Sequence, residues 1–191
     1  MNLQGKYPTT PDEFLRWNEG REGKREFVRG RVVEMMINVT RNHWRLCNRL
    51  ERQIAAQLGD DEFDVGTTDF GVRTPDGVRF PDLIVEAAAE NGKALATAAP
   101  LVLAEILSPS SIADDFGSKA RDYLGIETLE HYLVISQDEF RVWRWSRSAE
   151  NEWLQPTVVE AHAFDLEIAG RTVVIDMVAL YAGIAKPPMA F

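Results

Sequence analysis

The run P-L-V-L-A-E-I-L at residues 100–107 limits the possible folds of this 191-residue chain more than any other segment. It has the length of a β-strand and is apolar at every position except Glu105. A strand that is apolar on both faces is covered on both faces, as in the centre of an α/β sheet. We therefore expect Glu105 to be a buried carboxylate, on the strand face that also carries Leu101, Leu103 and Leu107.

A second carboxylate stands at the start of another short apolar run. Pro81-Asp82 introduces Leu83, Ile84 and Val85, so Asp82 is expected at the mouth of a strand. Two carboxylates near one sheet repel each other unless a divalent cation bridges them, and Mg²⁺ prefers one or two carboxylates plus water and phosphate oxygens. Together Asp82 and Glu105 suggest a Mg²⁺ site, which Mn²⁺ could also fill. Taken alone, Asp82 after a proline could simply be a structural residue that caps a loop.

A lysine falls on the apolar face of a predicted helix at residues 111–126. Ser111 and Asp114 match the capping-box pattern for a helix start. At about 100° per residue, Lys119 shares an arc with the apolar side chains, whereas the opposite side carries polar ones. The apolar arc contains Ile112, Phe116, Ala120, Tyr123 and Ile126, and the polar side contains Asp114, Ser118, Arg121 and Asp122. A buried ammonium needs an anion, so we expect Lys119 to meet a carboxylate; a Glu105–Lys119 ion pair without chemistry is the alternative.

Taken in chain order, Asp82, Glu105 and Lys119 with their neighbouring residues resemble a known family, the Uma-type putative restriction endonucleases of the PD-(D/E)XK nuclease superfamily. The likeness extends from about residue 10 to about residue 176. It includes Arg25-Glu26-Phe27 and residues 30–35, which look like the opening β-hairpin, followed by His43 and a long helix. It continues through Pro81-Asp82, Glu105-Ile106-Leu107-Ser108-Pro109-Ser110, Asp115, Lys119, Tyr123 and the strand at residues 131–135.

The resemblance implies a mixed α/β (α+β) fold and a nuclease activity. The fold would be a restriction-endonuclease-like central mixed β-sheet flanked by helices, with an N-terminal helix and β-hairpin, in one domain of residues 1–191. The active-site group would be Glu26, Asp82, Glu105 and Lys119, with Asp82 and Glu105 holding Mg²⁺ during hydrolysis of DNA phosphodiester bonds. The superfamily's lysine two residues after the acid is absent, because Leu107 stands there. In the resembled family a lysine from the following helix takes its place, as Lys119 would here.

Other interpretations of the same residues stay open. The chain could be a catalytically silent nucleic-acid or protein-binding module with a nuclease fold, or its metal chemistry could act on RNA or another phosphate ester. Glu26 could be an ordinary exposed hairpin residue, and Asp115 could either orient Lys119 or be solvated.

The charge distribution bears on nucleic-acid binding. A net charge of −9 disfavours a polyanion unless the charge is segregated. Residues 16–52 carry 10 basic and 5 acidic side chains, whereas the rest of the chain carries 11 basic and 25 acidic ones. The basic segment is a predicted DNA-backbone face, with Arg41, Arg45, Arg49 and Arg52 along one side of a helix at residues 41–58. A solvated helix face is the alternative.

Several further expectations concern the cysteine, the histidines, the cell compartment and the oligomeric state. Cys47 is interpreted as a small buried hydrophobe, and three histidines without i, i+4 pairing argue against a zinc site. No segment has the apolar length of a membrane span or the core of a signal peptide, so a cytoplasmic protein is expected. A homodimer is expected by analogy with nucleases that cut both strands.

The alanine-rich residues 86–99 are predicted to form a short helix or a mobile loop over the site. Further strands are expected near residues 140–145, 153–159 and 172–175.

Overall fold

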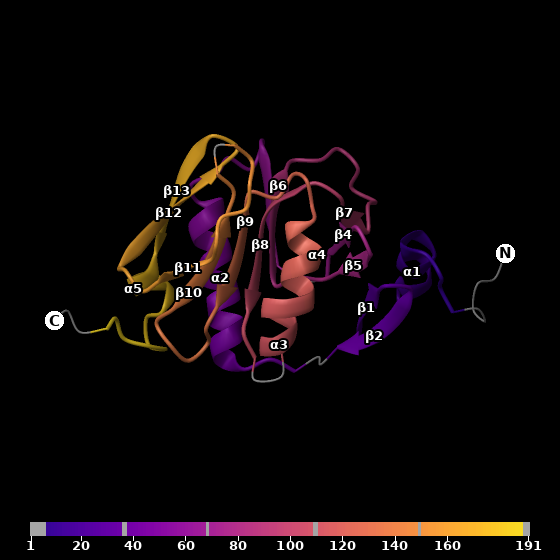
Figure 1. Ribbon diagram of the computed structural model, residues 1–191, viewed down its shortest axis with the longest axis horizontal. Helices are drawn as coiled ribbons and strands as arrows, with labels where there is room; N and C mark the ends of the chain where they lie inside the picture. The colour runs from indigo at the N-terminus through magenta and orange to yellow at the C-terminus, as the bar shows by residue number, and fades with distance from the viewer. Residues whose placement is uncertain (1–6, 36–37, 68, 109–110, 149, 189–191) are drawn as a thin grey trace.

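A six-stranded mixed sheet with the order β11-β10-β9-β8-β6-β3 lies at the centre of this computed structural model (Figure 1). The structure describes residues 7–35, 38–67, 69–108, 111–148 and 150–188. The strands β8 and β9 are parallel, and the other neighbouring pairs are antiparallel. The strands of this sheet are β3 (Phe63–Gly66), β6 (Leu83–Ala87), β8 (Pro100–Ile106), β9 (His131–Ile135), β10 (Val142–Ser146) and β11 (Thr157–Val159).

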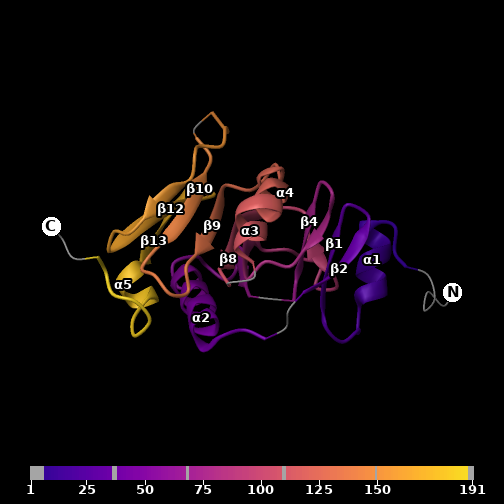
Figure 2. The same ribbon diagram turned by 60° about the horizontal axis from the view of Figure 1, so that its bottom comes forward.

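The apolar run at residues 100–107 forms β8, and both faces of this strand are covered, as predicted. On one face Val102, Ala104 and Ile106 pack in the same core cluster as the helix α2 (Arg41–Ala55). On the other face Leu103 packs in a cluster with the helix α4 (Ala120–Leu124). Figure 2 shows α2 and α4 on opposite sides of the sheet. Glu105 therefore projects into the α4 side, where it is 3% exposed.

The connection from β8 to β9 contains a π-helical turn that the sequence did not predict. The chain forms α3 (Ile112–Asp114), the π-helix η1 (Asp115–Lys119) and then α4. Lys119, Ala120, Tyr123 and Ile126 are buried as predicted.

Two details of the predicted helix faces are wrong. The wider π turn rotates Ile112 relative to the residues that follow the turn, and Asp122 is buried in an ion pair with Arg79. Ile112 is 50% exposed, and Asp122, predicted on the solvated side, is only 5% exposed. The expected capping box is also wrong, because the side chain of Ser111 caps no helix N–H and instead accepts a hydrogen bond from the Ser108 amide at 3.0 Å.

A second, five-stranded sheet at the N-terminal side has the order β2-β1-β5-β4-β7. Its strands are β1 (Lys24–Val28), β2 (Arg31–Met35), β4 (Gly71–Thr74), β5 (Gly77–Arg79) and β7 (Ala96–Thr97). The expected hairpin turns at Arg29 and Gly30, both with positive φ, as a tight two-residue turn requires. The expected helix α1 (Pro11–Asn18) begins at Thr10, whose Oγ1 accepts a hydrogen bond from the Glu13 amide. Gly77 is needed where β5 meets β1, because a Cβ there would lie 1.8 Å from Phe27 O.

A C-terminal hairpin and a short helix complete the core beside α2. They are β12 (Ala163–Ile168), β13 (Arg171–Asp176) and α5 (Met177–Leu180). β12 was not predicted, although its alternating burial pattern is typical of a half-buried strand. The expected strand at residues 153–159 is shortened to β11, with only an isolated bridge from Trp153 to Arg147 before it. Residues 86–99 form no helix and contribute the end of β6 and the strand β7. No helix in the described residues is long and apolar enough to cross a membrane.

Candidate active site

Lys119 lies between two carboxylates at the centre of the molecule. Its Nζ is 2.9 Å from Glu105 Oε2 and 3.0 Å from Asp115 Oδ1, and all three side chains are almost fully buried. Glu105 is the second-to-last residue of β8, and the other two are the first and last residues of the π turn. The predicted meeting of Lys119 with a carboxylate is confirmed. Asp115 contacts Lys119 and is not solvated.

Two tyrosines fix the geometry of this cluster. The Tyr123 hydroxyl donates to Glu105 Oε1 at 2.8 Å, and the Tyr132 hydroxyl donates to the backbone carbonyl of Asp115 at 2.9 Å. The two rings also pack against each other, edge to face, with centroids 5.2 Å apart. Because both tyrosines are fully buried, their hydroxyls do not bind solvent and instead hold the Glu105 carboxylate and the backbone of the π turn in place.

The cluster holds two buried carboxyl groups, Glu105 and Asp115, for one ammonium. Burial raises the pKa of Glu105 well above its usual value, although the Lys119 ammonium opposes the shift. Burial also raises the pKa of Asp115, again against Lys119. Burial alone would lower the pKa of Lys119, but Glu105, Asp115 and Glu26 outweigh it and raise that pKa. Several carboxylates thus share one ammonium, so an additional cation would be stabilised here.

Asp82 immediately precedes β6, the strand that pairs with the β8 strand of Glu105. Its backbone amide donates to Ala104 O at 3.0 Å, and the adjacent residue Leu83 pairs with Ala104. Its Oδ2 accepts a hydrogen bond from the Ile106 amide at 2.8 Å and lies 3.1 Å from His43 Nε2. Burial alone would raise the pKa of Asp82, but His43 and the Ile106 amide outweigh it and lower that pKa. Its charge contributes to the raised pKa of Glu105.

Glu26 belongs to a neighbouring ionic network and contacts none of the other three predicted site residues. Its Oε2 lies 2.7 Å from Arg79 Nη1, and its Oε1 accepts a hydrogen bond from the Phe80 amide at 3.2 Å. Arg79 also binds Asp122 Oδ2 at 2.6 Å and donates to the Ser118 hydroxyl at 2.9 Å. Glu26 is 1% exposed, so it is not an exposed hairpin residue. The network connects β1 and β5 to the helix that carries Lys119.

The donor set around Lys119 fits a hard divalent cation. Glu105 and Asp82 offer carboxylate oxygens from neighbouring strands, and each oxygen has a lone pair beyond the hydrogen bonds already made. The Asp115 carboxyl group is buried beside them and contacts Lys119 and Ser111. Oxygen ligands with excess negative charge are those that Mg²⁺ prefers. We therefore regard Asp82 and Glu105 as residues able to hold such an ion, with Asp115 beside them.

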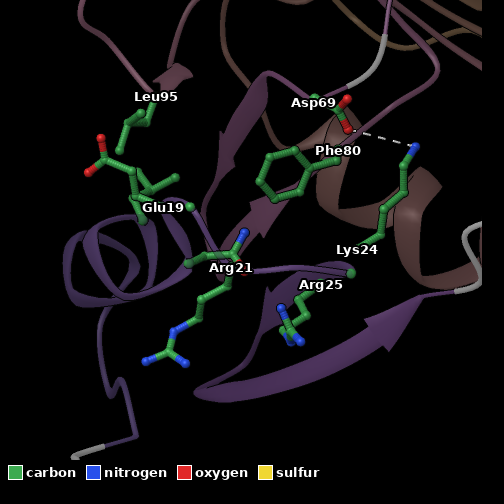
Figure 3. A pocket seen from close by; sticks show the side chains of 11 residues that line it. Glu19, Arg21, Lys24, Arg25, Asp69, Phe80 and Leu95 are labelled. Carbon is green, nitrogen blue, oxygen red and sulfur yellow. Dashed lines mark ion pairs between the residues drawn. The ribbon is translucent and has the colours of Figure 1, made fainter. Parts of the chain in front are cut away.

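A cavity of about 310 Å³ opens at the N-terminal helix and sheet (Figure 3). Arg21, Lys24 and Arg25 line it, together with Phe80, and the Lys24 ammonium is 4.0 Å from Asp69. Three basic side chains of the segment at residues 16–52 therefore meet here beside two carboxylates, Glu19 and Asp69. The predicted basic stripe along α2 is incomplete. Arg49 donates to the carbonyls of Leu180 and Ala182, so its guanidinium serves the packing of the C-terminal segment.

Sequence reasoning missed three partners of the predicted residues. Tyr123 was placed on the buried face but not as a donor to Glu105, although its position four residues after Lys119 was a usable signal. Arg79 was overlooked, and so was the pairing of His43 with Asp82. The contacts of Arg79 and His43 join residues far apart in the chain, where no local pattern reveals them.

Comparison with known proteins agrees with this architecture. The family model described as "Uma2: Putative restriction endonuclease" matches residues 11–174. An uncharacterized protein of Synechocystis sp. is 27% identical over 150 residues, which cover 76% of this chain and 84% of that protein. A second one from the same organism is 25% identical over 179 residues, covering 92% and 93%.

A solved structure supports the fold independently of close sequence similarity. The crystal structure of a "putative nuclease belonging to DUF820" from Anabaena variabilis aligns with a TM-score of 0.70 at 18% identity. The alignment covers 93% of this chain and 99% of that one. With the family match spanning most of its length, this chain belongs to the Uma2 family of putative restriction endonucleases.

Proposed function

We propose that the protein is a Mg²⁺-dependent endonuclease that hydrolyses DNA phosphodiester bonds at the Asp82–Glu105–Lys119 cluster. The observation that carries the proposal is the buried contact of Lys119 with Glu105 and Asp115, beside the neighbouring-strand carboxylate of Asp82. The family match and the structural neighbour support a nuclease as the general class.

In this proposal Asp82 and Glu105 hold the metal, and Mn²⁺ can replace Mg²⁺. When bound, the ion would orient the phosphate, stabilise developing negative charge and acidify a water molecule. Lys119 acts as a charged donor that orients the attacking water or stabilises the transition state, because its raised pKa keeps it protonated at neutral pH. Asp115 holds the Lys119 ammonium in position, and Tyr123 holds the Glu105 carboxylate.

Glu26 assists as a positioning residue in this account. Its carboxylate fixes Arg79, which in turn holds Asp122 and Ser118 on the segment that carries Lys119. In this account the cavity lined by Arg21, Lys24 and Arg25 supplies cations for the DNA backbone. A homodimer that places two such sites on opposite strands completes the proposal.

One observation favours the second candidate, a catalytically silent binding module. Both oxygens of Glu105 already accept bonds, from Tyr123 and Lys119, and the ammonium is only 4% exposed. A buried ion pair of this kind can serve the fold alone. Under this candidate the chain would bind nucleic acid or a protein without cleaving a phosphodiester.

Nicking of supercoiled plasmid DNA separates the two candidates. The purified wild-type protein is expected to nick with Mg²⁺ or Mn²⁺ and to stop when EDTA is added. Asp82→Asn, Glu105→Gln and Lys119→Met should each lower the rate by at least about 100-fold, whereas Glu167→Gln, a change at an exposed carboxylate, should not. Equal nicking by all variants would identify a contaminant and reject the proposal. A parallel assay with RNA decides between the two nucleic acids.

A further inference from the structure

The first turns of α2 carry a histidine and a cysteine beside Asp82, and their nitrogen and sulfur atoms are softer metal ligands than carboxylate oxygens. His43 and Cys47 are four residues apart and lie on the same helix face, with His43 Nδ1 3.5 Å from Cys47 Sγ. The other ring nitrogen of His43, Nε2, lies 3.1 Å from Asp82 Oδ2. One donor atom from each of the three residues lies within 4.8 Å of the other two. No other group of three or more His, Cys, Asp or Glu donors is this close in the described part of the chain.

We propose that His43, Cys47 and Asp82 form a binding site for Zn²⁺ or a similar borderline transition metal. Zn²⁺ accepts sulfur, nitrogen and oxygen ligands together, at bond lengths of about 2.0–2.3 Å, whereas Mg²⁺ requires oxygen. Tetrahedral coordination at these lengths separates the ligand atoms by about 3.4–3.6 Å. To bind one ion together, the three side chains have to rotate so that a single imidazole nitrogen faces both Asp82 and Cys47.

Burial and charge both suit this ion. His43 and Cys47 are 7% and 5% exposed, and the Asp82 side chain is 15% exposed. On binding, the Cys47 thiol proton is released to solvent and a metal–sulfur bond replaces the S–H bond. One carboxylate and one thiolate then neutralise the divalent ion, which reduces the cost of burying it. Three protein ligands leave a fourth position for water or a substrate oxygen.

The neighbouring contacts hold two of these ligands in place. The Ile106 amide donates to Asp82 Oδ2, and the His43 amide donates to Thr40 Oγ1 at the start of α2. Metal ligands are usually oriented by such outer hydrogen bonds. If the proposed function holds, Zn²⁺ bound here withdraws Asp82 from the Mg²⁺ site and inhibits DNA cleavage. Only this consequence rests on the proposed function, and the binding itself does not.

Titration with Co²⁺ tests the binding directly, because Cys47 is the only cysteine of the chain. A cobalt–thiolate charge-transfer band can therefore arise from no other residue. We expect the full-length, reduced protein to show this band on adding Co²⁺ and to lose it on adding Zn²⁺. The band should be absent in Cys47→Ser. In His43→Ala and Asp82→Asn the Co²⁺ affinity should fall at least about 10-fold.

Two further variants make the outcome decisive. His162→Ala changes an exposed histidine and should keep the band. Glu105→Gln should keep the band and lose Mg²⁺-dependent nicking, which separates the two sites. A folded wild-type protein without the band, or a band of unchanged affinity in both His43→Ala and Asp82→Asn, would overturn the inference. Nicking that persists in that case would leave the proposed function intact, whereas a band without nicking would support this site and reject the nuclease.

Discussion

The Lys119 ammonium lies 2.9 Å from a carboxylate oxygen of Glu105, although one residue belongs to the crossover helix and the other to a central strand. A parallel pair such as β8–β9 requires a crossover connection, and here the crossover lies over the face to which Glu105 points. The contact is therefore built by the sheet topology. Its energetic and chemical roles can be tested separately.

Replacing Lys119 by Met should destabilise the protein strongly. The change leaves Glu105 and Asp115 buried without their cation, which costs about 3–5 kcal/mol in the free energy of unfolding. The double variant Lys119→Met/Glu105→Gln should lose less than the sum of the two single changes, by about 0.5–3 kcal/mol. Urea denaturation of the four proteins measures this coupling. Strictly additive losses would show that the two side chains do not interact.

Removing Arg79 should be comparably costly. Glu26 and Asp122 are both buried and both bind its guanidinium, so Arg79→Gln should lower the free energy of unfolding by about 3–5 kcal/mol. Arg73→Gln is the matched control, because Arg73 pairs with the exposed Asp12 and should change stability far less. Similar losses in both variants would argue against a supporting role for the Arg79 network.

The basic cavity should set the salt dependence of DNA binding. Arg21→Ala and Lys24→Ala are expected to weaken binding to any duplex sequence. Each should make the slope of log K against log salt concentration shallower by about 1, because one DNA phosphate no longer has a cationic partner. Lys186→Ala, in the segment that follows α5, serves as the control, since Figure 1 shows α5 and α1 at opposite sides of the molecule. Fluorescence anisotropy over a range of salt concentrations gives the slopes, and identical slopes in all variants would place the DNA elsewhere.

His131 should make the protein less stable in acid. Burial lowers the pKa of His131, whose ring nitrogens lie 2.9 Å from Ser146 Oγ and from the carbonyl of Glu167. Near pH 6.5 the His131 imidazole is therefore protonated more readily in the unfolded chain than in the folded chain. The resulting stability is present above about pH 6.5 and is lost as the pH falls through the folded value.

Chemical denaturation at several pH values checks this expectation. Between about pH 7.5 and pH 5 the wild type should lose more free energy of unfolding than His131→Gln. His162→Gln, at an exposed position, should follow the wild type. An equal decline in His131→Gln would remove His131 as the cause.

The parts of the site that follow from hydrophobic pattern were predictable. Glu105 interrupts an apolar strand and Lys119 interrupts an apolar helix face, and each anomaly marked a buried charge that needed a partner. The burial of β8 on both faces followed from the same pattern. These predictions depend only on residues within one element.

Features that depend on contacts between elements were not predictable in this way. The π turn changes which residues of the helix face the core, and no periodicity in Asp115–Lys119 signals its wider hydrogen bonding. Arg79, Glu26 and Asp122 lie on three separate elements, β5, β1 and α4, and meet in one ionic network. The contact of His43 with Asp82 depends on α2 beginning beside the mouth of β6. The strand β12 is different, because its alternation was present in the sequence and was overlooked.

The most direct test of the nuclease account is a crystal structure with Mn²⁺ and a 5′-phosphorylated oligonucleotide. The phosphate supplies the oxygen ligands that complete the coordination of the ion. The account predicts an anomalous Mn²⁺ peak within bonding distance of carboxylate oxygens from both Asp82 and Glu105, with the Lys119 ammonium directed at the phosphate or its water. A well-ordered oligonucleotide whose phosphate and Mn²⁺ contact neither carboxylate would contradict it.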